Sequence, residues 1–144
     1  MARQFAESRF RYLHIACHGR RGSFRLTYDK VPYRNFAQII GPVITDRRLF
    51  LSACEIAHDE LAREIYKASR PYSITGPTCK ILFSDAAVIW ASLYNLLFKH
   101  DPVIIKGRVI RKFLRDLCEL YDVTFAHFGR IKKRPYFAPY SFGG

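Results

Sequence analysis

The chain has 144 residues, of which 49% are hydrophobic and 25% are charged. This length allows one domain, and the composition excludes a disordered, collagen-like or low-complexity chain. Lys and Arg outnumber Asp and Glu by 24 to 12, so the net charge is +12 and an acidic partner is favoured.

Cysteines and apolar stretches indicate the compartment. No apolar leader follows the first residues, and the longest apolar stretch, residues 86–98, is interrupted by Ser92 and Asn95 and is too short to span a bilayer. The cysteines are too widely spaced for a disulfide framework: Cys17, Cys54, Cys79 and Cys118. We therefore expect a cytoplasmic protein with reduced thiols and no membrane contact.

The first third of the chain predicts two strands and a helix. In residues 9–16, polar and apolar side chains alternate at first and are followed by an apolar run. This pattern is typical of a strand whose end is buried. Residues 23–28 alternate with period two and predict a strand that enters a hairpin at residues 29–30. Residues 35–40 predict a short helix, which the Gly-Pro pair at residues 41–42 closes.

In the middle of the chain, strands and helices alternate. The apolar run at residues 48–53 suits a central strand, and residues 59–69 have the apolar spacing and the acidic first turn of a helix. Residues 72–75 predict a third strand, stopped by Gly76 and Pro77.

Two further helices and a tail are expected. Residues 84–98 predict a mostly buried helix that begins with a capping Ser or Asp. An Asp-Pro pair caps the next helix within residues 101–121, which carries one apolar and one basic face. Residues 123–128 predict a last edge strand, and the tail, residues 130–144, is basic, aromatic and expected to be irregular.

Strands that are separated by helices predict one α/β domain, residues 1–144, around a mostly parallel sheet. In such sheets ligands bind at the carboxyl ends of the strands. The residues that follow the three predicted strands of this sheet are His18 and Gly19, then Cys54 and Glu55, then Gly76.

If the first two of these strands are neighbours, His18 lies near Cys54. A thiol is a nucleophile only as the thiolate, and a nearby imidazole removes its proton or stabilises the anion. The N–H groups of Gly19 and Cys54 are placed to donate to a developing oxyanion. A His and a Cys at strand ends are also compatible with simple packing.

The two sequence motifs around this pair are specific when they occur together. Residues 12–19 read YLHIACHG, and residues 49–55 read LFLSACE. Together they resemble the CHAT branch of the caspase-like cysteine peptidases, in which one strand ends in His-Gly and a later one in Ser-Ala-Cys followed by Glu or Asp. The later segments match that family in order as well: the hairpin at residues 23–33, the helix at residues 61–68, the strand that ends at Gly76-Pro77, and Asp85 followed by an aromatic helix. The resemblance therefore covers residues 9–98.

The resemblance implies a caspase-like three-layer sandwich and peptide-bond hydrolysis through an acyl-enzyme. His18 would be the general base or ion-pair partner, Cys54 the nucleophile, and Gly19 an oxyanion-hole donor, with no cofactor. Such domains are usually held inactive until a partner or ligand orders the site, so we expect a peptide or protein substrate and either a regulatory partner or self-association.

The chain also departs from the family. Members normally have a further strand and helix before the His strand, whereas eight residues precede Arg9, so the sheet is smaller, or another chain completes it, or the activity is altered. Ser52 stands where relatives that cut after basic residues have an acidic group. The candidate cleft residues are Glu55, Gly76 and Asp85.

Three other hypotheses stay open. Cys17, His18, Cys54 and His58 have the residue types of a zinc site but not a metal-binding signature, so no metal is expected. The basic clusters, together with the aromatic residues of the tail, suggest a nucleic-acid-binding domain as the second choice. The third hypothesis is a catalytically inactive caspase-like module that binds a partner protein by strand addition.

Overall fold

The computed structural model describes residues 2–144, so Met1, where the predicted domain begins, lies outside the described residues. The helices are α1 (Ala2–Glu7), α2 (Tyr33–Ile44), α3 (Asp59–Ala68), α4 (Phe83–His100) and α5 (Gly107–Tyr121). The strands are β1 (Tyr12–Ala16), β2 (His18–Arg20), β3 (Ser23–Arg25), β4 (Lys30–Pro32), β5 (Arg48–Ser52), β6 (Ser73–Pro77), β7 (Phe125–Arg130) and β8 (Phe137–Phe142). Within residues 2–144, none of the helices combines the length and the apolar character that crossing a bilayer requires.

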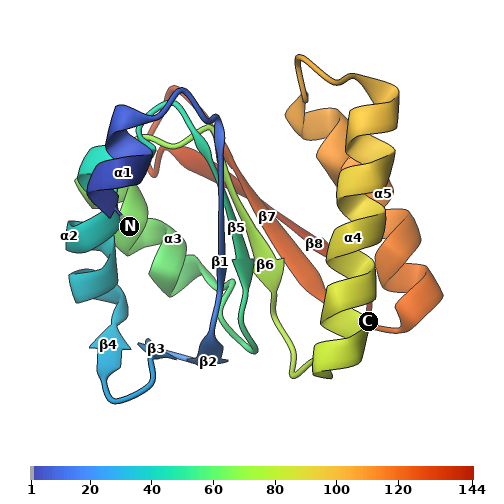
Figure 1. Ribbon diagram of the computed structural model, residues 1–144, viewed down its shortest axis with the longest axis horizontal. Helices are drawn as coiled ribbons and strands as arrows, with labels where there is room; N and C mark the ends of the chain where they lie inside the picture. Colours follow the sequence, from blue (N-terminus) through green and yellow to red (C-terminus); the bar gives the residue numbers. More distant parts are fainter. Residues whose placement is uncertain (1) are drawn as a thin grey trace.

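The architecture is a five-stranded sheet between two layers of helices. Figure 1 shows α1, α2 and α3 on one face of the sheet and α4 and α5 on the other. The strand order is β1-β5-β6-β7-β8. β1, β5 and β6 run parallel, whereas β7 and β8 each pair antiparallel with the preceding strand. The predicted α/β class is confirmed, but the sheet is mixed rather than mostly parallel.

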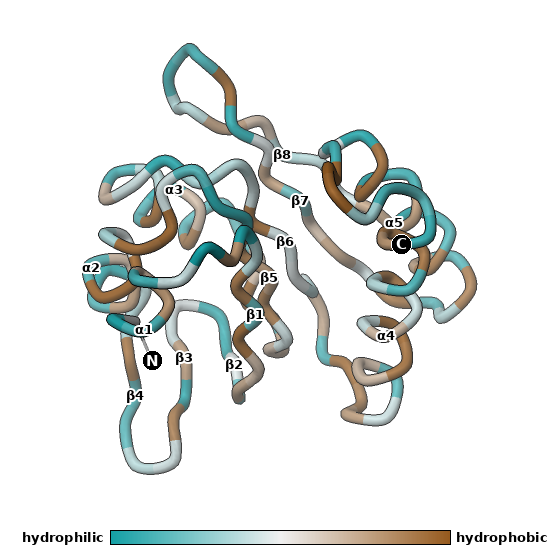
Figure 2. Tube along the Cα trace, turned by 45° about the horizontal axis from the view of Figure 1, so that its top comes forward, coloured by the Kyte–Doolittle hydropathy of each residue, from teal (hydrophilic) through white to brown (hydrophobic). Residues whose placement is uncertain are grey.

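Each face of the sheet has its own hydrophobic core, because successive side chains of a strand point to opposite faces. On β5, Leu49 and Leu51 are buried against α2 and α3, while Phe50 is buried against α4 and α5. Figure 2 shows that β1 and β5 in the centre of the molecule are mostly hydrophobic, whereas many of the outer loops and turns are hydrophilic. The continuous apolar run in the sequence is thus explained by a strand that is covered on both sides.

A second, three-stranded antiparallel sheet follows directly on β1, in the order β2-β3-β4. It lies at the carboxyl end of β1, at the bottom of Figure 1. Phe24 of β3 is almost fully buried and stacks on Phe36 of α2, with ring centroids 3.9 Å apart. This contact fixes the small sheet against the helical layer and therefore sets the position of His18, which begins β2.

Helix α2 extends beyond the Gly-Pro pair that was predicted to close it. The helix contains Pro42 and ends at Ile44. Gly41 lies against α3, where an added Cβ would come within 3.0 Å of the Cβ of Ala68. The absence of a side chain lets the two helices approach closely, and this packing stabilises a last turn that contains a proline.

The Gly76-Pro77 pair was predicted to stop the third strand, and this prediction is wrong. Both residues belong to β6 and are buried. The register with β5 ends at Thr75, so Pro77 is not required to donate a hydrogen bond on that side. Its carbonyl oxygen instead accepts hydrogen bonds from the N–H groups of Ile56 and Ala57, at 3.2 and 3.0 Å.

Three other predictions need correction. The side chain of Asp101 accepts hydrogen bonds from the N–H groups of Val103 and Ile104, but α5 begins only at Gly107. The tail is not irregular, because it forms β8, so β7 is not an edge strand. Helix α1 was not predicted; Phe5 packs it into the core, and Arg47 donates hydrogen bonds to the carbonyl oxygens of the helix.

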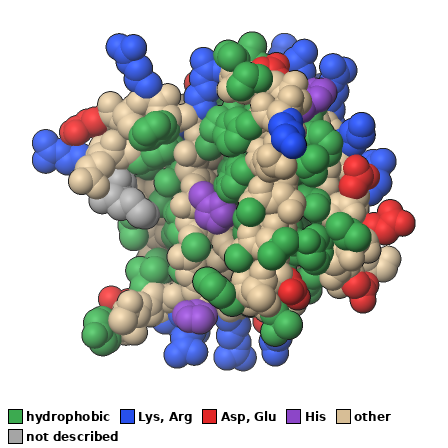
Figure 3. Space-filling view, turned by 45° about the vertical axis from the view of Figure 1, so that its right-hand side comes forward, with side chains coloured by type: hydrophobic (Ala, Val, Ile, Leu, Met, Phe, Trp, Pro, Cys, Tyr) green, Lys and Arg blue, Asp and Glu red, His purple; other side chains and the backbone are tan. Residues whose placement is uncertain are grey.

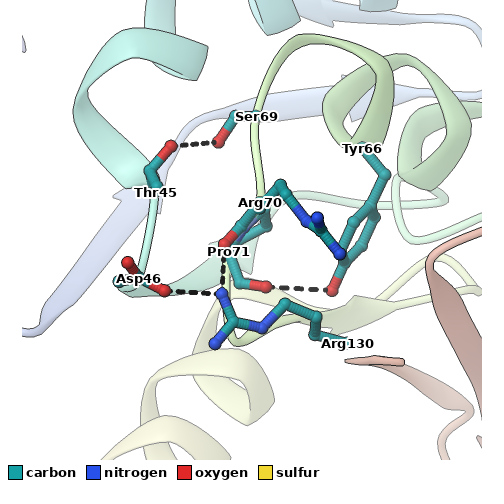
Figure 4. A network of polar contacts seen from close by, with 7 residues as sticks. All are labelled: Thr45, Asp46, Tyr66, Ser69, Arg70, Pro71 and Arg130. Carbon is teal, nitrogen blue, oxygen red and sulfur yellow. Dashed lines mark hydrogen bonds and ion pairs between the residues drawn. The ribbon is translucent and has the colours of Figure 1, made fainter. Parts of the chain in front are cut away.

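A polar network joins the loops at the amino ends of β5 and β6 (Figure 4). Arg130, at the end of β7, binds the carboxylate of Asp46 and the carbonyl oxygen of Arg70, at 2.5 and 3.0 Å. The hydroxyl of Tyr66 donates to the carbonyl oxygen of Pro71 at 3.3 Å. These bonds hold together the end of the sheet that lies opposite to His18.

A histidine is buried in the sheet itself. His127 on β7 has no exposed surface, and its Nδ1 atom lies 2.8 Å from the hydroxyl of Thr75. Among residues 2–144, its Nε2 atom has no hydrogen-bond partner. Burial, followed by the charges of Arg48 and Arg111, lowers the pKa of His127 from its ordinary value of 6.5 to about 3.

This histidine makes stability fall in mild acid. The unfolded chain takes up a proton near the ordinary histidine pKa, whereas the folded chain resists it until about pH 3, so stability is lost as pH falls through this window. We expect the free energy of unfolding to be about 2 kcal/mol lower at pH 5 than at pH 7 from His127 alone. Urea titrations at both pH values measure this, and the difference should shrink in His127→Asn. An unchanged difference in that variant would contradict the assignment.

Candidate functional site

The register of β1 and β5 brings His18 beside Cys54. Ala16 is opposite Ser52, and the N–H of Cys17 continues the ladder by donating to the carbonyl oxygen of Ser52 at 3.1 Å. Two residues further along each chain come His18 and Cys54. Since paired strands lie about 4.8 Å apart, these residues leave the sheet next to each other at its carboxyl edge.

The alternation along β1 indicates on which side of the sheet His18 is expected. On β1, Leu13 belongs to the core under α2, whereas His14 packs edge-on against Trp90 of α4, with ring centroids 4.7 Å apart. β1 ends at Ala16 and His18 begins β2 of the other sheet, so the same alternation, continued beyond the strand, only predicts His18 on the α4 side. The thiol of Cys54 lies on that side, because it donates a hydrogen bond to the carbonyl oxygen of Ile81, 3.5 Å away, just before α4.

Gly19 lies directly against the backbone of the Cys54 segment. An added Cβ would come within 2.9 Å of the Cβ of Ala53 and would overlap the carbonyl oxygen of Cys54. Real Cβ atoms do not make such contacts, and a backbone carbonyl at the end of a packed strand cannot move aside at low cost. The lack of a side chain at Gly19 therefore allows the two strand ends to touch.

We expect Gly19→Ala to lower the free energy of unfolding by about 1–3 kcal/mol, because the new methyl group forces the β2 and Cys54 segments apart. Gly129→Ala is the matched control, since a Cβ there meets its nearest atoms only at 3.8 Å, and its effect should stay below about 1 kcal/mol. Chemical denaturation measures both. Equal effects of the two substitutions would show that the close approach at Gly19 carries no strain.

A groove opens beside this edge. It has a volume of about 1140 Å³ and is lined by the end of β1, the β2–β3 hairpin, Glu55 and Lys80. His18 lines the groove and is exposed, whereas Cys54 is half-buried and is not among the described residues that line the groove. The groove thus gives a ligand access to the imidazole at the place where β1 and β5 end.

A different cysteine lines the groove. Cys17 precedes His18 and is half-buried, so it is a rival for the role of nucleophile. Burial raises the pKa of the Cys17 thiol, which disfavours the reactive thiolate. Cys17 packs against the core under α2, on the face away from α4. The burial of Cys17 and the face on which it lies therefore favour Cys54 as the nucleophile.

The predicted cleft residues are not all in one place. Glu55 lines the groove with a left-handed backbone (φ 52°), and its N–H donates to the carbonyl oxygen of Cys79 at 3.0 Å. Gly76 is buried inside β6, where an added Cβ would come within 2.9 Å of the carbonyl oxygen of Leu51. Asp85 lies in the first turn of α4. In the part of the chain that the structure describes, neither Gly76 nor Asp85 lines the groove.

Four basic residues that line the groove were not among the predicted site residues: Arg20, Arg21, Arg25 and Lys80. Arg25 lies directly opposite His18 in the β2–β3 register, and the hairpin pattern in the sequence could have indicated this pairing. Lys80 reaches the groove from the segment between β6 and α4. No local sequence pattern indicates that Lys80 lies near the groove. Its position depends on the pairing of β6 with the side of β5 that faces away from β1.

The residues considered as zinc ligands do not form a metal site. Within residues 2–144, no group of three or more His, Cys, Asp and Glu side chains is arranged to hold a metal ion. All four cysteines are free.

Comparison with known proteins gives no further assignment: no model of a protein family and no curated protein matches the chain. The functional argument therefore depends on the site itself.

Proposed function

We propose that the protein is a cysteine endopeptidase of the CHAT type, in which Cys54 is the nucleophile and His18 the base. The observation that supports the proposal is the parallel pairing of β1 and β5, because His18 and Cys54 each follow the last paired residues, Ala16 and Ser52, by two positions. The groove lined by His18 offers room for a polypeptide. The three layers and the hairpin between the two strands are also in line with a caspase-like fold.

The proposed reaction has two steps. His18 takes the proton of the Cys54 thiol, and the sulfur attacks the carbonyl carbon of the scissile peptide bond. The C–N bond breaks, and His18 gives its proton to the departing amine. Water then attacks the thioester and loses a proton to His18, the C–S bond breaks, and the proton returns to sulfur. Each proton that leaves a reacting atom thus passes through the same imidazole.

The oxyanion would be held by backbone N–H groups. In a two-residue hairpin, the pair that closes the turn, here Arg20 and Ser23, exchanges the ladder hydrogen bonds, and the next pair does not. The next pair contains Gly19, so its N–H points away from β3. Because a Cβ added at Gly19 would meet the carbonyl oxygen of Cys54, we expect this N–H to lie near the nucleophile, where an oxyanion-hole donor is needed.

The thiol of Cys54 also suggests regulation. Its hydrogen bond to the carbonyl oxygen of Ile81 turns the sulfur toward the segment before α4. Attack on a substrate requires the thiol to leave this acceptor and face His18, and a misplacement of about 1 Å can cost about a hundredfold in rate. A protein partner, or a second copy of the chain, that moves residues 79–82 would switch the enzyme on. We place its action in the cytoplasm, where a free thiol nucleophile stays reduced.

Thiol labelling tests the proposal without needing the activator. The protein is treated with limiting iodoacetamide, and the modified cysteines are located by mass spectrometry. Cys54 should be labelled faster than Cys17, Cys79 and Cys118, and His18→Ala should slow the labelling of Cys54 alone. Equal labelling of all four cysteines, or no effect of His18→Ala, would reject the dyad and leave the inactive, partner-binding module as the better hypothesis.

A further inference from the structure

The groove beside His18 is strongly basic. Its lining includes four permanently charged cationic side chains and a single carboxylate, that of Glu55. The cations are Arg20, Arg21, Arg25 and Lys80, and all of them are exposed. Only Arg21 has an ion-pair partner among residues 2–144, since it lies 3.5 Å from Glu60. The groove therefore presents unneutralised positive charge to whatever enters it.

The hairpin arranges this charge in a row. Arg25 of β3 lies directly between His18 of β2 and Lys30 of β4 in the two antiparallel registers. Side chains of directly opposite residues share a face and have Cβ atoms about 5 Å apart. Like charges in such positions destabilise a sheet, so the pair of Arg25 and Lys30 is unfavourable in the free protein. A bound anion would relieve this repulsion.

Basic and hydrophobic side chains are also unevenly distributed over the wider surface (Figure 3). On the face that Figure 3 shows, Lys and Arg side chains gather along the upper and lower borders, whereas hydrophobic side chains occupy the middle. Among residues 2–144, no Phe, Tyr or Trp lines the groove: besides His18 and the charged residues it is lined by small and aliphatic ones, such as Ala16, Leu26 and Thr27. Single-stranded nucleic acid is usually bound by aromatic side chains on which its bases stack.

The aromatic residues of the tail are also engaged elsewhere. Phe137 and Phe142 are buried. The guanidinium of Arg70 lies over the ring of Tyr136, and that of Arg111 over Tyr140, 4.8 and 4.2 Å from the ring centroids. These contacts are made within the chain and away from the groove, so they supply no stacking surface beside His18.

We propose that this groove binds an acidic segment of a polypeptide substrate, several residues long, and that its carboxylates are recognised by Arg25 and Lys80, which line the groove, and by Lys30, which does not line it but lies opposite Arg25. The volume of about 1140 Å³ exceeds that of most small-molecule pockets and suits an extended chain. The inference rests on the proposed peptidase function, and it adds that selection acts on acidic residues on one side of the scissile bond, because the row of cations extends away from His18.

Binding is measured first, with the Cys54→Ala variant, so that catalysis plays no part. Fluorescein-labelled twelve-residue peptides with alternating Glu are compared with a Gln-substituted peptide and with a single-stranded DNA of equal charge, by fluorescence anisotropy. The acidic peptide should bind at least about tenfold tighter than the Gln peptide. Adding Arg25→Gln and Lys30→Gln should remove most of this preference, whereas adding Lys132→Gln, in the β7–β8 turn, should not. Equal binding of the Glu and Gln peptides, or tighter binding of the DNA, would overturn the inference.

Cleavage then separates this inference from the proposed function. Two peptides share one neutral sequence around the scissile bond, and only one of them carries an acidic run beginning three residues away. The inference predicts faster cleavage of the acidic peptide and loss of the difference in Arg25→Gln. Equal cleavage of both would overturn the inference and leave the peptidase in place. If neither peptide is cleaved and Cys54 shows no selective labelling, the proposed peptidase function is rejected. The anisotropy measurement then decides by itself whether the groove binds acidic peptides.

Discussion

Replacing Cys54 with alanine is expected to lower the rate of peptide hydrolysis by at least about a thousandfold, because the variant has no atom that can form the acyl-enzyme. Cys54 is half-buried at the end of β5, so loss of its sulfur should leave the fold intact. Hydrolysis of an acidic peptide is followed by chromatography, and circular dichroism of both proteins checks the fold.

Cys17→Ala is the matched control, since Cys17 is adjacent to His18, lines the groove and is also half-buried. Burial raises the pKa of the Cys17 thiol, and Cys17 packs against the core under α2. The rate of peptide hydrolysis should therefore change by less than about threefold in Cys17→Ala. A large loss in Cys17→Ala with none in Cys54→Ala would exchange the roles of the two cysteines and refute the assignment.

Phe50→Ala is expected to lower the free energy of unfolding by about 3–5 kcal/mol. Phe50 lies at the centre of β5, is almost fully buried, and packs among Tyr12, Trp90 and Tyr94, with ring centroids 5.6–6.3 Å apart. Alanine leaves a cavity that these large rings cannot fill without leaving their own positions. Since the stability of a domain is about 5–15 kcal/mol, this loss is large.

Urea denaturation measures the effect, and Tyr28→Ala is its control. Tyr28 is 95% exposed beyond the end of β3, so its removal should change stability by less than about 0.5 kcal/mol. A loss of less than about 1 kcal/mol for Phe50→Ala would mean that α4 does not pack on β5 as described.

The parallel part of the fold was readable from the sequence, because its strands are apolar runs and its helices have amphipathic spacing. Residues 9–16 and 48–53 predicted β1 and β5, and residues 59–69 predicted α3 almost to the residue. The position of His18 beside Cys54 followed from one assumption, that these strands are neighbours, which the register confirms. The catalytic roles of both residues stay a prediction.

The errors occurred where tertiary contacts override local signals. Pro77 stays in a strand because the pairing with β5 ends two residues earlier. β8 forms in a segment rich in Pro and Gly because Phe137 and Phe142 are buried against the rest of the molecule. Lys80 lines the groove only because β6, which precedes it in the chain, pairs with β5. No sequence window contains these partners, so propensity and periodicity could not show them.

The claim on which the account depends is that the sulfur of Cys54 and the ring of His18 can meet. The reagent 1,3-dibromoacetone, whose two reactive carbons are separated by one carbonyl group, bridges a thiol and an imidazole only when both lie within a few ångströms. Peptide mapping after its addition should yield a species in which Cys54 is joined to His18, and His18→Gln should abolish it. Single alkylation of Cys54, or a bridge from Cys17 instead, would contradict the account.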